Sequence, residues 1–309
     1  MAPSTVSTAF TEQYAANVYV LAQQKGSKMR AKVRNETVVA AKNRFFERLG
    51  EAEAQQITTR HGHTPLNEIP HSRRRLTPAD YNTAELLDNQ DELKMLIEPT
   101  SQYANAQAMA LGRITDDIII DAALGAVATG VAGGTSLDFE DDSISIDGDA
   151  LGVATTLGTL AVVGAVADID LEKMLLMMQI FNDADVDPDI PKYWMVSPKT
   201  ISDMLNITEL GSADYNTVKT LVQGKVDSFM GFNFFWSNRI TKDAATETAY
   251  RSIAWAEDGL ILGSAENIKS RITERDDKNY SVQVYSEMSC GAIRLDGDKV
   301  HECLNKVAV

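Results

Sequence analysis

The stretch VDSFMGFNFFWSNRI at residues 226–240 places five aromatic side chains within the eight residues from Phe229 to Trp236. Platforms that stack nucleic-acid bases combine aromatic side chains with a basic groove, and Arg239 is the only cation in this stretch. A small-molecule pocket needs convergent polar groups, and the stretch offers none. The segment FNFFW, which follows Gly231, therefore predicts a strand that packs aromatic side chains into a protein core.

The composition sets the class of protein. The chain has 309 residues, of which 44% are hydrophobic, so it can bury the core of one large domain or two ordinary ones. Its net charge of −15 disfavours general nucleic-acid binding. Its two cysteines, Cys290 and Cys303, indicate a reducing compartment and no disulfide framework. No secretory signal is apparent at the N-terminus. Residues 118–134 carry Asp121 near their start and residues 150–167 hold few large apolar residues, so neither predicts a membrane span, and both are interpreted as interior secondary structure.

The charge is unevenly distributed. Residues 25–75 hold 12 Lys and Arg against 5 Asp and Glu, while the remainder holds 17 against 39, so a +7 segment adjoins a −22 body. This pattern favours association between copies, although a solvated basic loop is the alternative. Arg73, Arg74 and Arg75 are the candidates for contact between subunits. The segment 60–82, which has few large apolar residues, is predicted to extend onto a neighbouring subunit.

Several helices and turns follow from local patterns. A helix of about 24 residues after Pro99 is predicted from apolar residues on one face, namely Ala104, Ala108, Leu111, Ile114, Ile118 and Ala122. A second helix has the predicted apolar face Leu171, Met174, Leu175, Met178 and Phe181. Ser197 is the predicted N-cap of a third helix, with Pro198 at its first position. Asp296 and Gly297 separate two strand-like runs, which predicts a hairpin.

No pattern typical of catalysis or cofactor binding emerges. The chain lacks the phosphate-binding loop, the dinucleotide fingerprint, the nucleophile elbow and the zinc-protease motif. His61, His63 and His71 are interpreted as surface residues rather than metal ligands. The acidic segments 138–142 and 183–189 do not match a calcium-binding loop and are interpreted as solvated loops. We therefore expect no enzyme, no catalytic residues, no cofactor and no metal, with a soluble enzyme as a minor alternative.

The order of segments along most of the chain, from about residue 30 to the end, resembles the major capsid proteins of tailed bacteriophages, with the Hong Kong ninety-seven type fold. The resemblance rests on five segments in sequence: LLDNQDELKMLIEPTSQYANAQAMALGRITDDIIIDAALG (86–125), DLEKMLLMMQIFNDADV (170–186), YWMVSPKTISDMLN (193–206), GKVDSFMGFNFFWSNRI (224–240) and the closing strands through NYSVQVYSEMSCGAIRLDGDKVHECL (279–304).

The resemblance implies an α+β subunit whose parts follow one another along the chain. They are an N-terminal arm (1–30), an extended loop region with flanking strands (31–89), a spine helix and peripheral domain (90–150), an axial domain (151–250) and return strands of the peripheral domain (251–309). It also implies that residues 226–240 contribute a strand to the central sheet of the axial domain. In that strand Phe232, Phe234 and Trp236 alternate with Asn233 and Phe235.

The resemblance further implies a structural role. The subunit is expected to self-assemble into hexamers and pentamers of an icosahedral head that encloses double-stranded DNA without sequence-specific binding. Portal and scaffolding proteins are the expected partners, with a decoration protein as a further candidate and no membrane contact. The expected location is the virion capsid, assembled in the bacterial host cytoplasm. An encapsulin-type compartment shell protein shares the fold and is the main alternative.

Overall fold

The computed structural model describes residues 23–38, 42–56, 60, 66–87, 100–146, 168–207, 228–242 and 248–307. The chain divides into two compact units, each built from three stretches of sequence. Unit 1 comprises Met1–Gly26, Tyr81–Arg113 and Ile268–Met288, and unit 2 comprises Ser27–Asp80, Ile114–Asn267 and Ser289–Val309. Residues 150–167, which were predicted to form interior secondary structure, lie outside the described residues, as does most of the predicted N-terminal arm.

The largest sheet belongs to unit 2 and has six strands in the order β7-β14-β11-β8-β10-β9. Its members are β7 (Ser145–Ile146), β8 (Lys192–Val196), β9 (Ser228–Phe229), β10 (Phe232–Trp236), β11 (Ala249–Ala256) and β14 (Val300–Lys306). Strand β10 runs parallel to β8, while β8 and β11 are antiparallel. Strands from the predicted axial segment and from the predicted return segment therefore share one sheet, and the five-part domain scheme stays a prediction.

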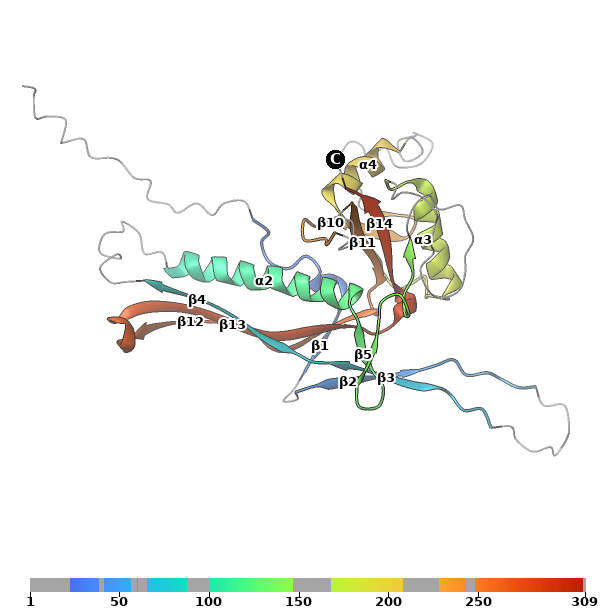
Figure 1. Cartoon of the computed structure of the whole chain (residues 1–309), viewed down its shortest axis with the longest axis horizontal. Coiled ribbons are helices and arrows are strands. Elements are labelled where there is room, and N and C mark those ends of the chain that lie inside the picture. The colour runs from blue at the N-terminus through green and yellow to red at the C-terminus, as the bar shows by residue number, and fades with distance from the viewer. Residues whose placement is uncertain are drawn as a thin grey trace, which may run out of the picture. The chain divides into compact units, whose positions relative to one another are not determined.

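Two helices cover one face of this sheet, α3 (Leu171–Asp183) and α4 (Pro198–Asn206) (Figure 1). Ser197 caps α4 as predicted, because its Oγ accepts a hydrogen bond from the backbone N–H of Thr200 at 3.1 Å. The apolar face predicted for α3 is partly wrong, since the side chain of Leu175 is 42% exposed. Met177 and Ile180 are buried instead, together with the aliphatic part of Lys173, whose ammonium donates to the carbonyl of Leu304.

The aromatic stretch forms the predicted strand. Gly231 has φ +82° at the tight turn between β9 and β10, a conformation that favours glycine. Phe232 and Phe234 are buried and pack around Trp194 at ring-centroid distances of 5.4 Å each. The expectation that Trp236 joins them in the core is wrong: its side chain is 46% exposed, because β10 ends there.

The end of β10 instead contacts two lysines near residue 30, Lys28 and Lys32. The ammonium of Lys28 lies 3.6 Å from the ring centroid of Trp236 and donates to its backbone carbonyl at 3.0 Å. The ammonium of Lys32 lies 4.3 Å from the Phe235 ring centroid. The aromatic stretch therefore both fills the core and holds the chain near residue 30 against the opposite face of the sheet.

A second sheet contains the strand order β1-β12-β13-β4. Its members are β1 (Arg34–Thr37), β4 (Ala79–Leu87), β12 (Leu260–Arg275) and β13 (Ser281–Arg294). The predicted hairpin at Asp296–Gly297 is wrong, because β13 pairs within this sheet while β14 pairs with β11 and β7. The chain changes sheets at Gly297, where a Cβ atom would lie only 1.8 Å from the backbone oxygen of Asp142. This glycine permits a close backbone approach rather than a hairpin turn.

The predicted long helix is confirmed as α2 (Thr100–Leu124), but its buried face is rotated from the predicted one. Leu111 is buried as expected, whereas Ile114 and Ile118 are only partly buried. Within unit 2 the fully buried positions include Ile119 and the polar Asp116. The Asp116 carboxylate accepts hydrogen bonds from the side chain of Ser27 and from the backbone N–H groups of Lys28 and Met29. Hydrogen bonds to Asp116, rather than the spacing of apolar residues, therefore determine which side of this part of the helix is buried.

Candidate inter-subunit surface

The third sheet carries the arginine triplet and has the strand order β2-β3-β5-β6. Its members are β2 (Arg44–Leu49), β3 (His71–Leu76), β5 (Val127–Thr129) and β6 (Thr135–Leu137). Strands β2 and β3 pair antiparallel over six residues each, from Arg44 opposite Leu76 to Leu49 opposite His71 (Figure 1). Alternation along β2 turns every second side chain to solvent, so this pair of strands, called here the β2–β3 hairpin, has an open face.

Large apolar side chains lie exposed on the hairpin and on the segment that leads into β3. The exposed fractions are 39% for Phe45, 68% for Leu49, 93% for Leu66 and 39% for Ile69. Single exposed apolar residues are ordinary, but several on one projecting element are typical of an interaction surface.

The structure separates the three arginines proposed as inter-subunit contacts. Arg73 points outward, with 38% of its side chain exposed, and its Nη2 lies 2.6 Å from Oε1 of Glu47 on β2. Arg74 points the other way, as strand alternation requires, and is 1% exposed inside its own subunit. Arg75 is half-buried, and its side chain lies beside Gly133. Contact with another subunit stays a prediction for Arg73 and Arg75, whereas Arg74 is committed to partners within its own chain.

The partners of Arg74 are Asp142 and the main chain of Arg294. Arg74 Nη1 and Nη2 lie 2.8 and 2.5 Å from Oδ2 and Oδ1 of Asp142, and Nη1 also donates to the carbonyl of Arg294 at 2.7 Å. Arg294 Nε donates to Oδ2 of Asp142 at 2.8 Å. The interpretation of segment 138–142 as a solvated loop is therefore wrong for Asp142, whose side chain is 10% exposed.

The electrostatics of this cluster keep Asp142 ionised. Burial alone raises the pKa of the Asp142 carboxyl, but hydrogen bonds and charge attraction from Arg74 and Arg294 outweigh burial, so its pKa lies below the ordinary value. Burial lowers the pKa of Arg294, and the adjacent Asp142 carboxylate offsets part of that effect. The guanidinium of Arg294 remains charged because an arginine is protonated at any physiological pH.

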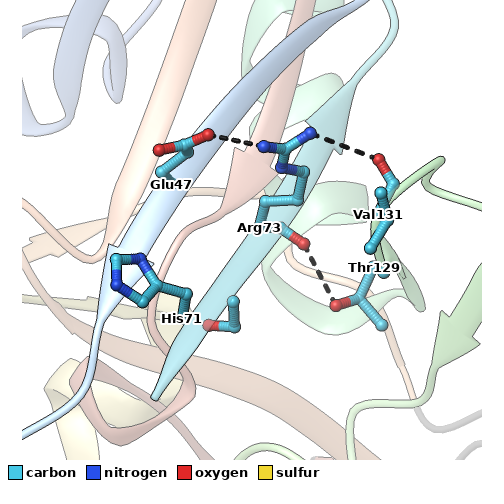
Figure 2. A pocket seen from close by; sticks show the side chains of 7 residues that line it. Glu47, His71, Arg73, Thr129 and Val131 are labelled. Carbon is cyan, nitrogen blue, oxygen red and sulfur yellow. Dashed lines mark hydrogen bonds and ion pairs between the residues drawn. The ribbon is translucent and has the colours of Figure 1, made fainter. Parts of the chain in front are cut away.

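A cavity of about 290 Å³ lies between the hairpin and the turn that joins β5 to β6 (Figure 2). Its lining residues are Glu47, His71, Ser72, Arg73, Thr129, Gly130 and Val131. Figure 2 shows Arg73 between Glu47 and the carbonyl of Val131, while Thr129 Oγ1 donates to the Arg73 carbonyl at 3.1 Å. The Arg73 and Glu47 side chains in the lining are thus paired with each other.

Among the described residues, no group of three His, Cys, Asp or Glu side chains is placed to hold a metal ion. His71 lies at the start of β3, while His61 and His63 lie outside the described residues. In the described parts of the chain, no helix is both long and apolar enough to cross a membrane.

The sequence motifs missed Asp142 and Arg294 as the partners of Arg74. The 68 and 220 residues that separate them from Arg74 leave no local signal. An aspartate in an acidic run and an arginine at the end of an amphipathic strand look like surface residues in the sequence alone. Only the fold brings these charges together.

The family described as "Phage capsid protein" matches residues 6–307, so the chain belongs to this family of phage capsid proteins. Its role is that of a structural major capsid protein, located in the virion capsid. No curated protein sequence matches the chain significantly.

Solved capsid structures share the fold over nearly the whole chain. The capsid of the cyanophage P-SCSP1u has a TM-score of 0.75 at 17% identity, over 99% of this chain and 96% of that chain. The capsid of cyanophage Pam1 has a TM-score of 0.72 at 14% identity, over 100% of both chains. The capsid of an empty GTA particle has a TM-score of 0.64 at 12% identity, over 99% of this chain and 100% of that chain. The family match favours a phage capsid over the encapsulin-type alternative.

Proposed function

We propose that this subunit assembles, through contacts that include the β2–β3 hairpin, into hexamers and pentamers of a closed icosahedral head. The single observation that carries this proposal is the set of exposed apolar side chains on and near the hairpin, including Leu49 and Leu66. Burying this apolar surface against a second copy contributes a gross gain of about 25 cal/mol per Å², from which the entropy cost of association is subtracted. Shell closure adds to this gain, because later contacts form between subunits that are already held together.

The head encloses double-stranded DNA without reading its sequence. Outside residues 25–75 the chain carries 17 basic and 39 acidic residues, and this excess of negative charge opposes strong binding of DNA phosphates to the shell. Portal and scaffolding proteins are the expected assembly partners, with a decoration protein as a further candidate. Assembly takes place in the host cytoplasm, and the subunit works without enzymatic activity.

The test replaces exposed leucines of the hairpin segment by asparagine. Leu49→Asn and Leu66→Asn together should leave the circular dichroism spectrum unchanged and reduce the yield of shells measured by sedimentation. Leu175→Asn is the matched control, because Leu175 is an exposed leucine on α3, away from the hairpin. Normal shell yield from the double variant would contradict a role for the hairpin in assembly.

A further inference from the structure

Both strands of the β2–β3 hairpin are fixed to the body of unit 2 by ion pairs. On β2, Arg48 Nη2 lies 2.6 Å from Oδ1 of Asp296, which precedes the short helical turn at Gly297–Lys299. On β3, Arg74 makes its two-point contact with Asp142. The paired strands are therefore held on two sides, and a backbone hydrogen bond from the Gly50 N–H to the Pro70 carbonyl, at 2.8 Å, lies just beyond these anchors.

Asp142 is the centre of this arrangement because it binds two arginines at once. Arg294, the second of them, also donates from Nη1 to the carbonyl of Ala123 at 2.7 Å and to that of Gly125 at 3.1 Å. These carbonyls belong to the C-terminal end of α2, where a cation interacts favourably with the helix dipole. One carboxylate thus connects the hairpin, the end of β13 and the end of the long helix.

Net stability alone does not account for such a cluster. A buried ion pair gains little over a well-packed apolar group, because removing the charges from water costs about as much as their attraction returns. Arg74 is 1% exposed and the side chain of Arg294 is 0% exposed, so both guanidinium groups bear that cost. Among the described residues, Nη2 of Arg294 has no hydrogen-bond partner, and this increases the cost of removing the guanidinium from water. A two-point pair between an arginine and a carboxylate adds geometric specificity as well as energy.

We propose that Asp142 is the positioning residue of the β2–β3 hairpin: it fixes the direction in which the hairpin leaves the subunit and so presents the contact surface in one orientation. This proposal rests on the proposed function, in which the hairpin contacts a second copy. Six paired residues span roughly 20 Å, so a small rotation at the anchors moves the far end by several ångströms. Such a shift displaces the contact surface relative to the neighbouring copy, and we expect it to hinder closure of the shell.

The direction of the hairpin is measurable as a distance within one subunit. Spin labels attached at Glu51→Cys, beyond the end of β2, and at Ser202→Cys on α4 report it, because both positions are exposed in unit 2. The native Cys290 and Cys303 are buried and are poor targets for the label. The full chain is used, with labelled copies diluted into an excess of unlabelled protein, so that distances between subunits do not contribute.

The decisive variant is Asp142→Asn, which keeps the size of the side chain and removes its charge. We expect a broader distance distribution with a shifted maximum, and a loss of closed shells in favour of irregular aggregates. Glu47→Gln is the matched control, since it removes the exposed partner of Arg73 on the same hairpin without touching Asp142. The control should retain the distance distribution of the parent chain.

A second variant covers the case in which Asp142→Asn does not fold. Arg74→Lys keeps the positive charge but replaces the two-point contact by a single ammonium, so we expect a smaller broadening in the same direction. An unchanged distance distribution in a folded Asp142→Asn or Arg74→Lys protein would overturn the proposal. Failure of the proposed function is distinguishable, because a parent chain that never assembles would fail the sedimentation assay whatever distances the labels report.

Discussion

The guanidinium of Arg74 and the carboxylate of Asp142, 68 residues apart in the sequence, meet in a two-point ion pair with N–O distances of 2.8 and 2.5 Å. Arg73, the preceding residue, points to the other side of the same strand and keeps 38% of its side chain exposed. The three consecutive arginines are therefore not equivalent, because Arg73 is exposed and Arg74 is buried. Arg74 binds partners within its own subunit, whereas contact between Arg73 and another subunit stays a prediction.

Replacing Arg74 by glutamate should destabilise the subunit itself. The change puts a second negative group beside Asp142 and leaves that carboxylate buried without its two-point partner. Breaking a buried ion pair costs about 3–5 kcal/mol. Chemical denaturation monitored by circular dichroism should show a loss of this order, and a variant as stable as the parent would mean that Arg74 is not essential to the junction.

Replacing Arg73 by glutamate should weaken assembly while the subunit stays folded. Exposed charge pairs contribute only about 0.2–1 kcal/mol each, but the change is repeated at every equivalent contact of the shell. The defect should lessen at about 1 M salt, where the Debye length is about 3 Å. Sedimentation at low and high salt measures it.

The control for Arg73 exchanges the two charges. Glu47 lies directly opposite Arg73 in the strand register, so Arg73→Glu combined with Glu47→Arg restores the pair within the subunit. If a positive charge at residue 73 matters to a neighbouring copy, the exchanged variant should still assemble poorly. Full recovery would show that Arg73 acts only within its own subunit.

Two positions on β10, Phe234 in its middle and Trp236 at its end, should respond differently to truncation. Phe234 is 5% exposed and stacks on Trp194, so Phe234→Ala should lower the free energy of unfolding by about 3–5 kcal/mol. Trp236→Ala should cost about 1 kcal/mol or less, chiefly through loss of the contact with the Lys28 ammonium. Equal losses in the two variants, measured by urea denaturation, would contradict the burial pattern of the strand.

His301 should make the subunit less stable in mild acid. Burial lowers the pKa of His301 from 6.5 to about 4, although its hydrogen bond to the Asp298 carbonyl opposes this shift. The unfolded chain therefore binds the proton first, and the stability that comes from a neutral His301 is full above pH 6.5 and is lost as the pH falls toward 4. At 1.36 kcal/mol per unit, the loss between about pH 7.5 and about pH 5 is about 2 kcal/mol.

The variant His301→Gln isolates this effect, because glutamine does not titrate. Its stability at neutral pH should be lower, since the edge contact with the Phe181 ring is lost. Its further loss of stability between about pH 7.5 and about pH 5 should be smaller than that of the parent chain by about 2 kcal/mol. The same pH dependence in both proteins would show that His301 is not held neutral by the fold.

Sequence patterns correctly predicted those parts of the fold that depend on residues close together in the sequence. The Ser197 cap, the extent of α2 and the strand at Phe232–Trp236 all depend on side chains within a few positions of one another. The order of these segments then sufficed to recognise the capsid fold, because the resemblance extends over most of the chain.

What the sequence did not predict depends on contacts between distant segments. Asp116 is a helix residue whose burial makes sense only when the backbone of Lys28 and Met29 reaches it. The sequence Asp296–Gly297 is typical of a hairpin turn, and this suggested the wrong structure. The actual role of Gly297 is to allow a close approach to the backbone of Asp142, and this contact depends on tertiary structure. The burial of Arg74 also depends on tertiary structure. Strand alternation shows that the side chains of Arg73 and Arg74 lie on opposite faces of β3, but it does not show which of these faces is buried.

The measurement that tests the central claim most directly is negative-stain electron microscopy of the purified chain, concentrated alone and together with the scaffolding and portal proteins proposed as its partners. We expect closed shells of uniform size, or hexamers and pentamers that convert into them. A chain that stays monomeric at high concentration in both preparations would contradict it.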